Sequence, residues 1–368
     1  MTGAKRTGAE RGRVSDEPRP TDAGRVGGNR ELAGAEQEGE ERADSGTDGV
    51  RAGVERDEAT RRDSNALAAA AENPRARFLF VSGSRVAVEP GAERVLALSA
   101  GCVAPEARRR AVYLGLVDGA PYFACDAGDA DDFARDPRLV SRAIPAASPP
   151  AAVAEGDERA WSVSADFASV PLTSHLWPSV EAELAVEAVA ISNWIGGTRF
   201  CHRCGEPLSL RSGGWEMVCG RGHTVFPRVD PAVIMAVRDA EDRLLLARNG
   251  RWAPGRLSVL AGFVEAGEPL ESAVAREVLE ETGVVVDDVA YVTSQPWPFP
   301  RSLMLAFEGR TRARQEDVKV DGEELVFARF FSREEFSGAL ASGEIGLPTP
   351  TSVSARLIER WLGRPLVG

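Results

Sequence analysis

The segment from Gly262 to Gly283 constrains the fold of this chain more than any other feature. Glu268 follows Gly262 after five residues, Arg276 follows after seven more, and the sequence Glu-x-x-Glu-Glu-x-Gly closes the segment. Residues 268–282 predict a helix, because a proline stands at an early helical position and Gly283 suits the C-terminal cap. The segment therefore predicts a helix that follows a glycine-containing loop and carries acidic side chains at fixed places.

The two faces of this predicted helix differ in chemistry. Its buried face is formed by aliphatic residues at four-residue spacing, namely Leu270, Val274 and Val278. Glu277, Glu280 and Glu281 stand at i, i+3 and i+4, so their carboxylates converge on one patch. Such glutamates often form only a solvated face, but a bound cation would turn their mutual repulsion into attraction. Carboxylate oxygens favour Mg²⁺ or Mn²⁺.

A second group of metal-binding side chains stands about sixty residues earlier. Cys201-His-Arg-Cys204 places two thiols on one tight turn, and Cys219 follows after fourteen residues. His223 is the natural fourth ligand, because a glycine stands where a fourth cysteine would complete a second Cys-x-x-Cys; His202 is the alternative. Zn²⁺ prefers four such ligands in a tetrahedron, which leaves no open position for chemistry. The pattern predicts a structural zinc ribbon, with a degenerate ribbon that holds no metal as the alternative.

Composition divides the chain into four predicted parts. Residues 1–77 contain no Phe, Tyr, Trp or Ile, so they are expected to form a disordered tail with a transient helix near residues 65–71. Residues 78–195 alternate short apolar runs with turn residues and predict an N-terminal α+β domain. Residues 196–228 form the predicted ribbon, and residues 229–368 form the domain that carries the glutamates.

Within the N-terminal domain, particular segments predict particular elements. Strands are expected near 77–81, 111–117 and 121–125, and a helix is expected over 181–194. Residues 145–150 predict a proline-rich loop. Cys102 and Cys125 lack metal-ligand spacing and are expected to be small buried residues.

Charge and hydropathy exclude several classes of protein. The chain carries 44 Lys and Arg against 56 Asp and Glu, a net charge of -12. This argues against a protein whose main affinity is for a phosphate backbone. The longest apolar runs are far shorter than the roughly 20 residues of a membrane span. The N-terminus lacks the apolar core of a secretory signal, and we expect a soluble, cytoplasmic protein that does not bind membranes.

The glutamate segment matches the pattern G-x5-E-x7-R-E-U-x-E-E-x-G-U, with U aliphatic, at every specified position. The sequence thereby resembles the Nudix hydrolases. The resemblance implies an α/β/α sandwich that hydrolyses a nucleoside diphosphate linked to another group. It implies that Glu277, Glu280 and Glu281 bind the metal and that Glu281 or Glu280 activates water. Arg276 would orient a glutamate.

A second motif indicates the substrate. Residues 294–302 read SQPWPFPRS, which resembles the signature of the NADH pyrophosphatase branch, whose members also remove NAD caps from RNA. Closely spaced prolines stiffen this segment, and a rigid aromatic ring can stack on a base. The resemblance implies Glu324 as a further metal ligand and a homodimer that shares this loop. The substrate-binding residues it implies are Phe263, Gln295, Trp297, Phe299, Ser302 and Ser354.

The sequence therefore predicts a Nudix domain preceded by a zinc ribbon, an N-terminal α+β domain and a disordered tail. The predicted activity is metal-dependent hydrolysis of NAD(H) to NMN(H) and AMP, and removal of NAD caps from RNA. Two alternatives stay open. One is a Nudix hydrolase for ADP-ribose or a diadenosine polyphosphate. The other is a zinc-ribbon nucleic-acid-binding regulator with an inactive Nudix fold.

Overall fold

The computed structural model describes residues 53–89, 91–128, 166–320 and 322–366. Most of the predicted tail and the predicted loop at 145–150 lie outside these ranges. Residues 53–77 do not: they contain helices α1 (Glu58–Arg62) and α2 (Ser64–Ala71). The predicted boundary of the tail at residue 77 is therefore wrong.

Specific contacts explain why residues 53–77 are ordered despite their polar composition. Val54 is buried, Asp57 accepts a hydrogen bond from the Tyr113 hydroxyl at 2.7 Å, and the Arg61 guanidinium lies 3.9 Å from the centre of the Trp215 ring. Each contact joins this segment to residues far along the chain. Local composition does not show such partners.

The N-terminal domain is built on a six-stranded sheet with the order β4–β5–β1–β2–β6, and β3 pairs with β1. The bounds are β1 Arg77–Ser82, β2 Arg85–Val88, β3 Leu98–Ser99, β4 Val112–Val117, β5 Ala120–Asp126 and β6 Asp166–Ser169. The helices are α3 Pro105–Arg110, α4 Val170–Thr173 and α5 Ser179–Gly197. The predicted strands near 77, 111 and 121 and the helix near 181 are confirmed as β1, β4, β5 and α5. Cys125 is buried as expected, whereas Cys102 is partly exposed.

The ribbon is a three-stranded antiparallel sheet with the order β7–β8–β9. Its strands are β7 Leu208–Arg211, β8 Glu216–Cys219 and β9 Thr224–Val225. Gly205 adopts φ +76° directly after the first cysteine pair, a conformation that favours glycine. The chain can therefore turn back toward β7.

The C-terminal domain has a mixed sheet with the order β13–β14–β10–β11–β15, and β12 pairs with β10. β10 and β14 run parallel, and the other pairs are antiparallel. The bounds are β10 Asp230–Arg238, β11 Leu244–Asn249, β12 Leu260–Phe263, β13 Asp288–Trp297, β14 Ser302–Arg310 and β15 Leu325–Phe331.

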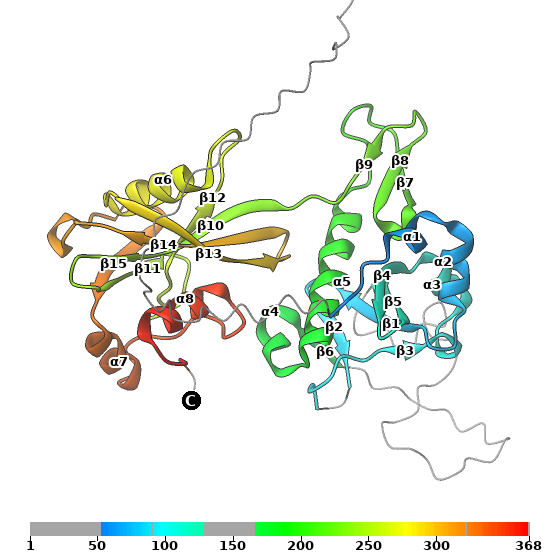
Figure 1. Cartoon of the computed structure of the whole chain (residues 1–368), viewed down its shortest axis with the longest axis horizontal. Helices are drawn as coiled ribbons and strands as arrows, with labels where there is room; N and C mark the ends of the chain where they lie inside the picture. Colours follow the sequence, from blue (N-terminus) through cyan, green and yellow to red (C-terminus); the bar gives the residue numbers. More distant parts are fainter. Residues whose placement is uncertain (1–52, 90, 129–165, 321, 367–368) are drawn as a thin grey trace, which may run out of the picture. The chain divides into compact units, whose positions relative to one another are not determined.

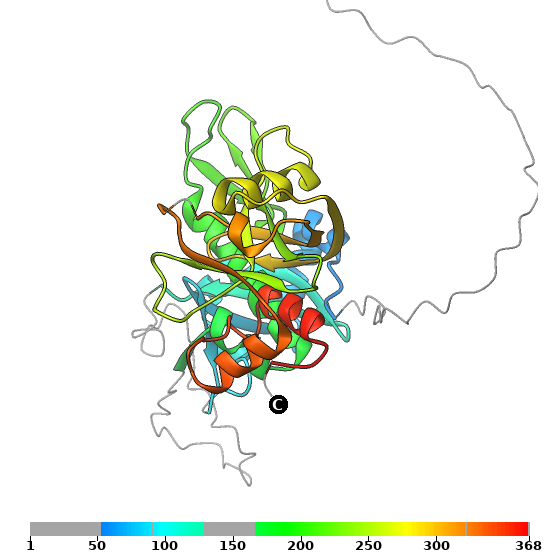
Figure 2. The same cartoon turned by 90° about the vertical axis from the view of Figure 1, so that its left-hand side faces the viewer.

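Helices cover both faces of this sheet, α6 (Leu270–Thr282) on one face and α8 (Val353–Leu362) on the other (Figures 1 and 2). Alternate residues of β10 explain the two cores: Val233 and Met235 share a buried cluster with the valines of α6, whereas Ile234 shares one with α8. α7 (Arg333–Ala341) packs on the end of β15. The predicted α/β/α sandwich is confirmed.

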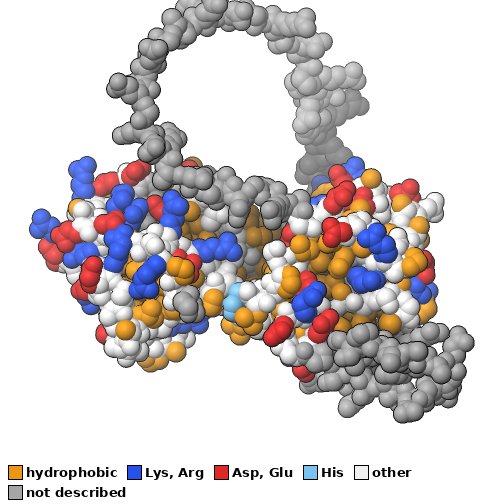
Figure 3. Space-filling view, turned by 60° about the horizontal axis from the view of Figure 1, so that its bottom comes forward, with side chains coloured by type: hydrophobic (Ala, Val, Ile, Leu, Met, Phe, Trp, Pro, Cys, Tyr) orange, Lys and Arg blue, Asp and Glu red, His pale blue; other side chains and the backbone are white. Residues whose placement is uncertain are grey.

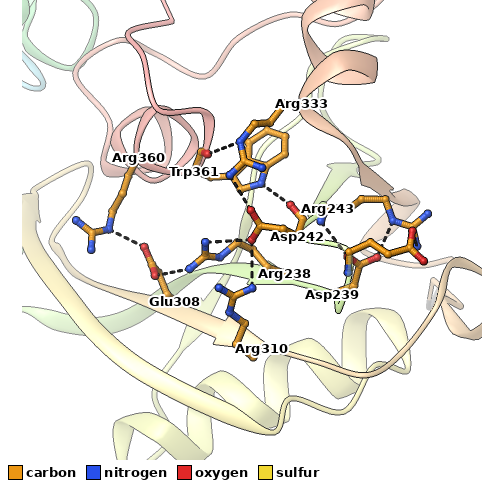
Figure 4. Close-up of polar contacts among 10 residues, drawn as sticks. Arg238, Asp239, Asp242, Arg243, Glu308, Arg310, Arg333, Arg360 and Trp361 are labelled. Atoms are coloured by element: carbon orange, nitrogen blue, oxygen red, sulfur yellow. Dashed lines mark hydrogen bonds and ion pairs between the residues drawn. The ribbon is translucent and has the colours of Figure 1, made fainter. Parts of the chain in front are cut away.

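A polar network joins the end of β10 to β14, α7 and α8 (Figure 4). Asp242 accepts hydrogen bonds from Arg238, Arg310 and Arg333 at 3.2, 3.1 and 2.7 Å. The Trp361 indole N–H donates to the Asp242 carbonyl at 2.8 Å. Burial disfavours ionisation of Asp242, but these guanidinium groups outweigh it and lower its pKa. The network ties α7 and α8 to the sheet.

The surface shown in Figure 3 mixes acidic, basic and hydrophobic side chains over the described residues. Charges of both signs are interspersed on this face, although the whole chain carries a net charge of -12. Among the described residues, no helix combines the length and the hydropathy that crossing a membrane requires.

Candidate active site and metal centre

Arg276 is the centre of the polar contacts on α6. It donates two hydrogen bonds to the Glu268 carboxylate, from Nε at 2.8 Å and from Nη2 at 3.0 Å. A further bond from Nη2 reaches the Phe263 carbonyl at 2.8 Å. Nη1 donates to Glu277 at 2.9 Å and to Glu280 at 3.0 Å. The planar five-donor guanidinium therefore fixes two of the predicted metal ligands and the loop before the helix.

The same contacts set the ionisation of the surrounding carboxyl groups. The two bonds from Arg276 lower the pKa of Glu268, which therefore stays ionised. Burial raises the pKa of Glu277, and the nearby charges of Glu280 and Glu324 raise it further, against the opposing effect of Arg276. A cation bound among these carboxylates would relieve this repulsion.

Gly262 is required by the position of Glu277. A Cβ atom built on Gly262 would lie 1.9 Å from the carboxyl carbon of Glu277 and 2.2 Å from both of its oxygens. Any side chain at position 262 would therefore displace that carboxylate. The first glycine of the sequence pattern thus makes room for a glutamate fifteen residues later.

The helix begins slightly later than predicted. α6 starts at Leu270 with Pro269 as its N-cap, and it ends at the predicted cap Gly283, which has φ +69°. Glu268 therefore lies in the preceding loop, where its carboxylate also accepts the Glu265 amide at 3.0 Å. Its role is to hold this loop and Arg276, while Val274 and Val278 are buried as predicted.

A cavity of about 260 Å³ lies beside the predicted metal ligands. Glu281, which is 6% exposed, and Glu324, which lies in the loop directly before β15, both line it. Asn249 at the end of β11 donates to the Glu324 carboxylate at 3.4 Å. Much of the remaining lining is apolar, for example Ile234 and Leu260. The cavity joins carboxylates to a surface that suits a base or a ribose.

The predicted substrate-binding residues occupy different environments. Phe263 is 61% exposed beside the Arg276 cluster, so its ring is available for stacking. Trp297 lines the cavity, and its ring meets that of Phe299 edge-on at 5.1 Å. Ser302 begins β14 and pairs with Trp297 across the strands.

Gln295 and Ser354 have contacts that fix the cavity wall. The side-chain amide of Gln295 donates a hydrogen bond to the Thr351 carbonyl and accepts one from the backbone N–H of Val353, both at 2.7 Å. Ser354 is buried, and its hydroxyl lies 2.7 Å from that of Ser258. Both residues line the cavity, but Gln295 is engaged in holding the start of α8.

Trp252 and Arg256 are cavity residues that the sequence reasoning missed. Both lie in the loop between β11 and β12, which has no recognisable motif. Their signal in the sequence is only an aromatic residue and an arginine four positions apart, shortly before Gly262. That signal is too common to identify a site.

In the ribbon, Cys201, Cys204, Cys219 and His223 offer ligand atoms that all lie within 4.8 Å of one another. Cys201 Sγ is 3.6 Å from His223 Nδ1, and Cys204 Sγ is 3.6 Å from Cys219 Sγ. Burial opposes ionisation of Cys201, but hydrogen bonds from the Arg203 and Cys204 amides outweigh it and lower its pKa to about 6. This donor set fits a tetrahedral zinc ion.

Comparison with known proteins identifies the family. The NUDIX domain model matches residues 228–348. An NAD-capped RNA hydrolase NudC from Mycobacterium bovis (strain BCG / Pasteur 1173P2) is 37% identical over 321 residues, which cover 84% of this chain and 93% of the relative. The chain belongs to the NudC branch of the Nudix family.

Two further relatives extend this comparison. An NAD-capped RNA hydrolase NudC from Mycobacterium tuberculosis (strain ATCC 25618 / H37Rv) is 36% identical over the same share of both chains. An NAD-capped RNA hydrolase NUDT12 from Macaca fascicularis is 38% identical over 195 residues, 50% of this chain and 42% of that protein. The predicted family and its NADH pyrophosphatase branch are confirmed.

Proposed function

We propose that the chain is a Nudix NAD(H) diphosphatase that also removes NAD caps from RNA. It would convert NADH and water to NMNH and AMP, and NAD-capped RNA to NMN and 5'-monophosphate RNA. The observation that carries this proposal is that Glu281, Glu324 and Trp297 line one cavity, while Arg276 holds Glu277 and Glu280 on the same helix as Glu281. The similarity to relatives named as NAD-capped RNA hydrolases supports the choice of substrate.

The four glutamates are the residues that would hold Mg²⁺ or Mn²⁺. Such an ion lowers the pKa of water and offsets the charge of the diphosphate. Hydrolysis joins the water oxygen to one phosphorus and breaks that atom's bond to the bridging oxygen, which leaves on the other phosphate. Glu281 or Glu280 would accept the proton of the water. Arg276 keeps Glu277 and Glu280 in place during this step.

The aromatic residues would bind the two bases of the substrate. Phe263 presents an exposed ring next to the glutamates. Trp297 lines the same cavity as Glu281. A ring that is already fixed costs little entropy when it stacks on a base. Ser354 would complete this surface and Gln295 would hold its wall, while Phe299 and Ser302 would contribute through their contacts with Trp297.

The ribbon would bind Zn²⁺ through its three cysteines and His223 in a structural role. We also propose that residues 53–195, 196–228 and 229–368 act as the N-terminal domain, the ribbon and the Nudix domain of a homodimer in which the partner's 294–302 loop contributes to each site. The test of the dimer is the mass of the protein in solution.

Product analysis tests the activity most simply. The purified protein is incubated with NADH and Mg²⁺ or Mn²⁺ beside the variants Glu281→Gln and Glu271→Gln. Glu271 is the matched control, because it is exposed in the first turn of the same helix. We expect NMNH and AMP from the wild type and from Glu271→Gln, and a loss of roughly a hundredfold or more in Glu281→Gln.

Other outcomes separate the alternatives. Cleavage of ADP-ribose or a diadenosine polyphosphate, but not of NADH, would identify a different Nudix substrate. Absence of cleavage of every nucleoside diphosphate, with the divalent ion shown to bind, would favour the regulatory alternative.

A further inference from the structure

An arginine at the cavity has no assigned partner in the chemistry proposed above. The Arg256 side chain is exposed and lines the cavity that also contains Glu281 and Glu324. Within the part of the chain that the structure describes, its contact is with an aromatic ring: its guanidinium carbon lies 5.4 Å from the centre of the Trp252 ring. Both side chains come from the β11–β12 loop, residues 250–259.

This loop is held in place by its backbone. Asn249 accepts the Arg251 amide at 3.0 Å and the Trp252 amide donates to the Asn249 carbonyl at 3.0 Å. Gly255 adopts φ +82°, and a Cβ atom there would lie 2.7 Å from the Glu344 carbonyl oxygen. The Gly346 amide donates to the Gly255 carbonyl at 2.9 Å. The chain therefore positions Trp252 and Arg256 at the cavity.

Charge balance indicates which phosphate group of the substrate Arg256 binds. The cation that the glutamates would hold compensates the diphosphate of the substrate, and Glu281 is buried where it lines the cavity. Arg256 is exposed, and free NAD(H) has no other phosphate to offer it. An NAD-capped RNA differs there, because the ribose of its adenosine continues through a phosphodiester to the second nucleotide. That phosphodiester would face the carboxylates without a counter-charge if Arg256 were absent.

We propose that Trp252 and Arg256 bind the first nucleotide that follows the cap of an NAD-capped RNA. The Arg256 guanidinium pairs with the phosphodiester, and the Trp252 ring stacks on the base. An aromatic ring beside an arginine is the usual arrangement for single-stranded nucleic acid, and it does not depend on the base sequence. This inference rests on the proposed function. It assigns these two residues to the choice between capped RNA and free dinucleotide.

The experiment compares two substrates on the same variants of the full chain. Values of kcat/KM are measured for NADH and for a short NAD-capped RNA with Arg256→Ala, Trp252→Ala, Trp252→Phe and the control Arg251→Ala. Arg251 is an exposed arginine of the same loop that does not line the cavity. We expect Arg256→Ala to lower kcat/KM about tenfold more on capped RNA than on NADH, mainly through KM. Trp252→Phe should retain more activity on RNA than Trp252→Ala.

Salt dependence gives a second readout. Loss of one phosphate contact to a single strand should reduce the slope of log kcat/KM against log salt by about 0.7 in Arg256→Ala and leave it unchanged in Arg251→Ala. Equal losses on NADH and on capped RNA would overturn the inference, because Arg256 would then contact the shared dinucleotide. Unchanged cleavage of capped RNA by Arg256→Ala would also overturn it. Absence of NADH cleavage by the wild type would instead contradict the proposed function.

Discussion

The ribbon and helix α6 both gather metal-binding side chains, but they do so in opposite ways. In the ribbon, all four ligand atoms lie within 4.8 Å of one another and two of the three cysteines are buried. On α6, Arg276 holds Glu277 and Glu280, whereas Glu281 is buried and lines a cavity.

This difference indicates different roles. A site whose ligands close around an ion stabilises a fold, whereas a site that faces a cavity leaves coordination positions for water and substrate. The sulfur atoms of the ribbon and the carboxylate oxygens proposed as ligands on α6 would also select different ions. The predictions below test whether the two sites are independent.

The largest expected effect is on stability, from Cys204→Ser in the ribbon. A serine oxygen is a poor replacement for a thiolate, so the variant should lose zinc and lower the free energy of unfolding by about 3 kcal/mol or more. Thermal unfolding with zinc analysis measures both. Cys102→Ser is the control, because Cys102 lies outside the cluster; if both variants lost the same stability, the ribbon thiols would have no special role.

Arg276→Ala should have the next largest effect, on activity. Without the guanidinium, Glu277 and Glu280 lose their common partner, and we expect kcat to fall about a hundredfold, or about 3 kcal/mol. Arg276→Lys should recover only part of this, since an ammonium group cannot donate in a planar fork. Arg312→Ala, whose side chain is 93% exposed, is the control. Wild-type kcat in Arg276→Ala would exclude a positioning role.

Gly262→Ala tests the close approach of β12 to Glu277. The added methyl group would displace a carboxylate that lies about 2 Å from the Cβ position, and kcat should fall about tenfold, which corresponds to 1.4 kcal/mol. Gly338→Ala in α7 has open space around its Cβ position and should leave kcat unchanged. A normal kcat in Gly262→Ala would show that Glu277 tolerates displacement.

The smallest effect is expected at the polar network of Asp242, away from both sites. Asp242→Ala should lower the free energy of unfolding by roughly 1 kcal/mol, because the carboxylate is partly exposed and its ion pairs are screened. The pKa of Asp242 is lower in the folded state, so its stabilisation is present above the unfolded pKa and is lost as the pH falls through the folded pKa. The free energies of unfolding of wild type and variant should therefore differ at neutral pH and converge at acidic pH. Glu241→Ala, 73% exposed, is the control; a constant difference at all pH values would exclude ionisation as the cause.

Regular patterns made much of this structure predictable. The helix α6 was predictable because its apolar spacing, its glutamates and Gly283 are all local in the sequence. The cluster of three cysteines and His223 was predictable from spacing alone. The order of residues 53–77 was not, because it depends on Trp215 and Tyr113, which lie far along the chain. Trp252 and Arg256 were missed for a related reason, since the fold brings their loop to the glutamates.

The most direct test of the two-site account measures zinc content and NADH hydrolysis on one sample after treatment with a mild chelator. The account predicts that hydrolysis is lost while about one zinc ion per chain remains, and that adding Mg²⁺ or Mn²⁺ restores hydrolysis. Loss of hydrolysis in proportion to loss of zinc, with no recovery on adding Mg²⁺ or Mn²⁺, would contradict it.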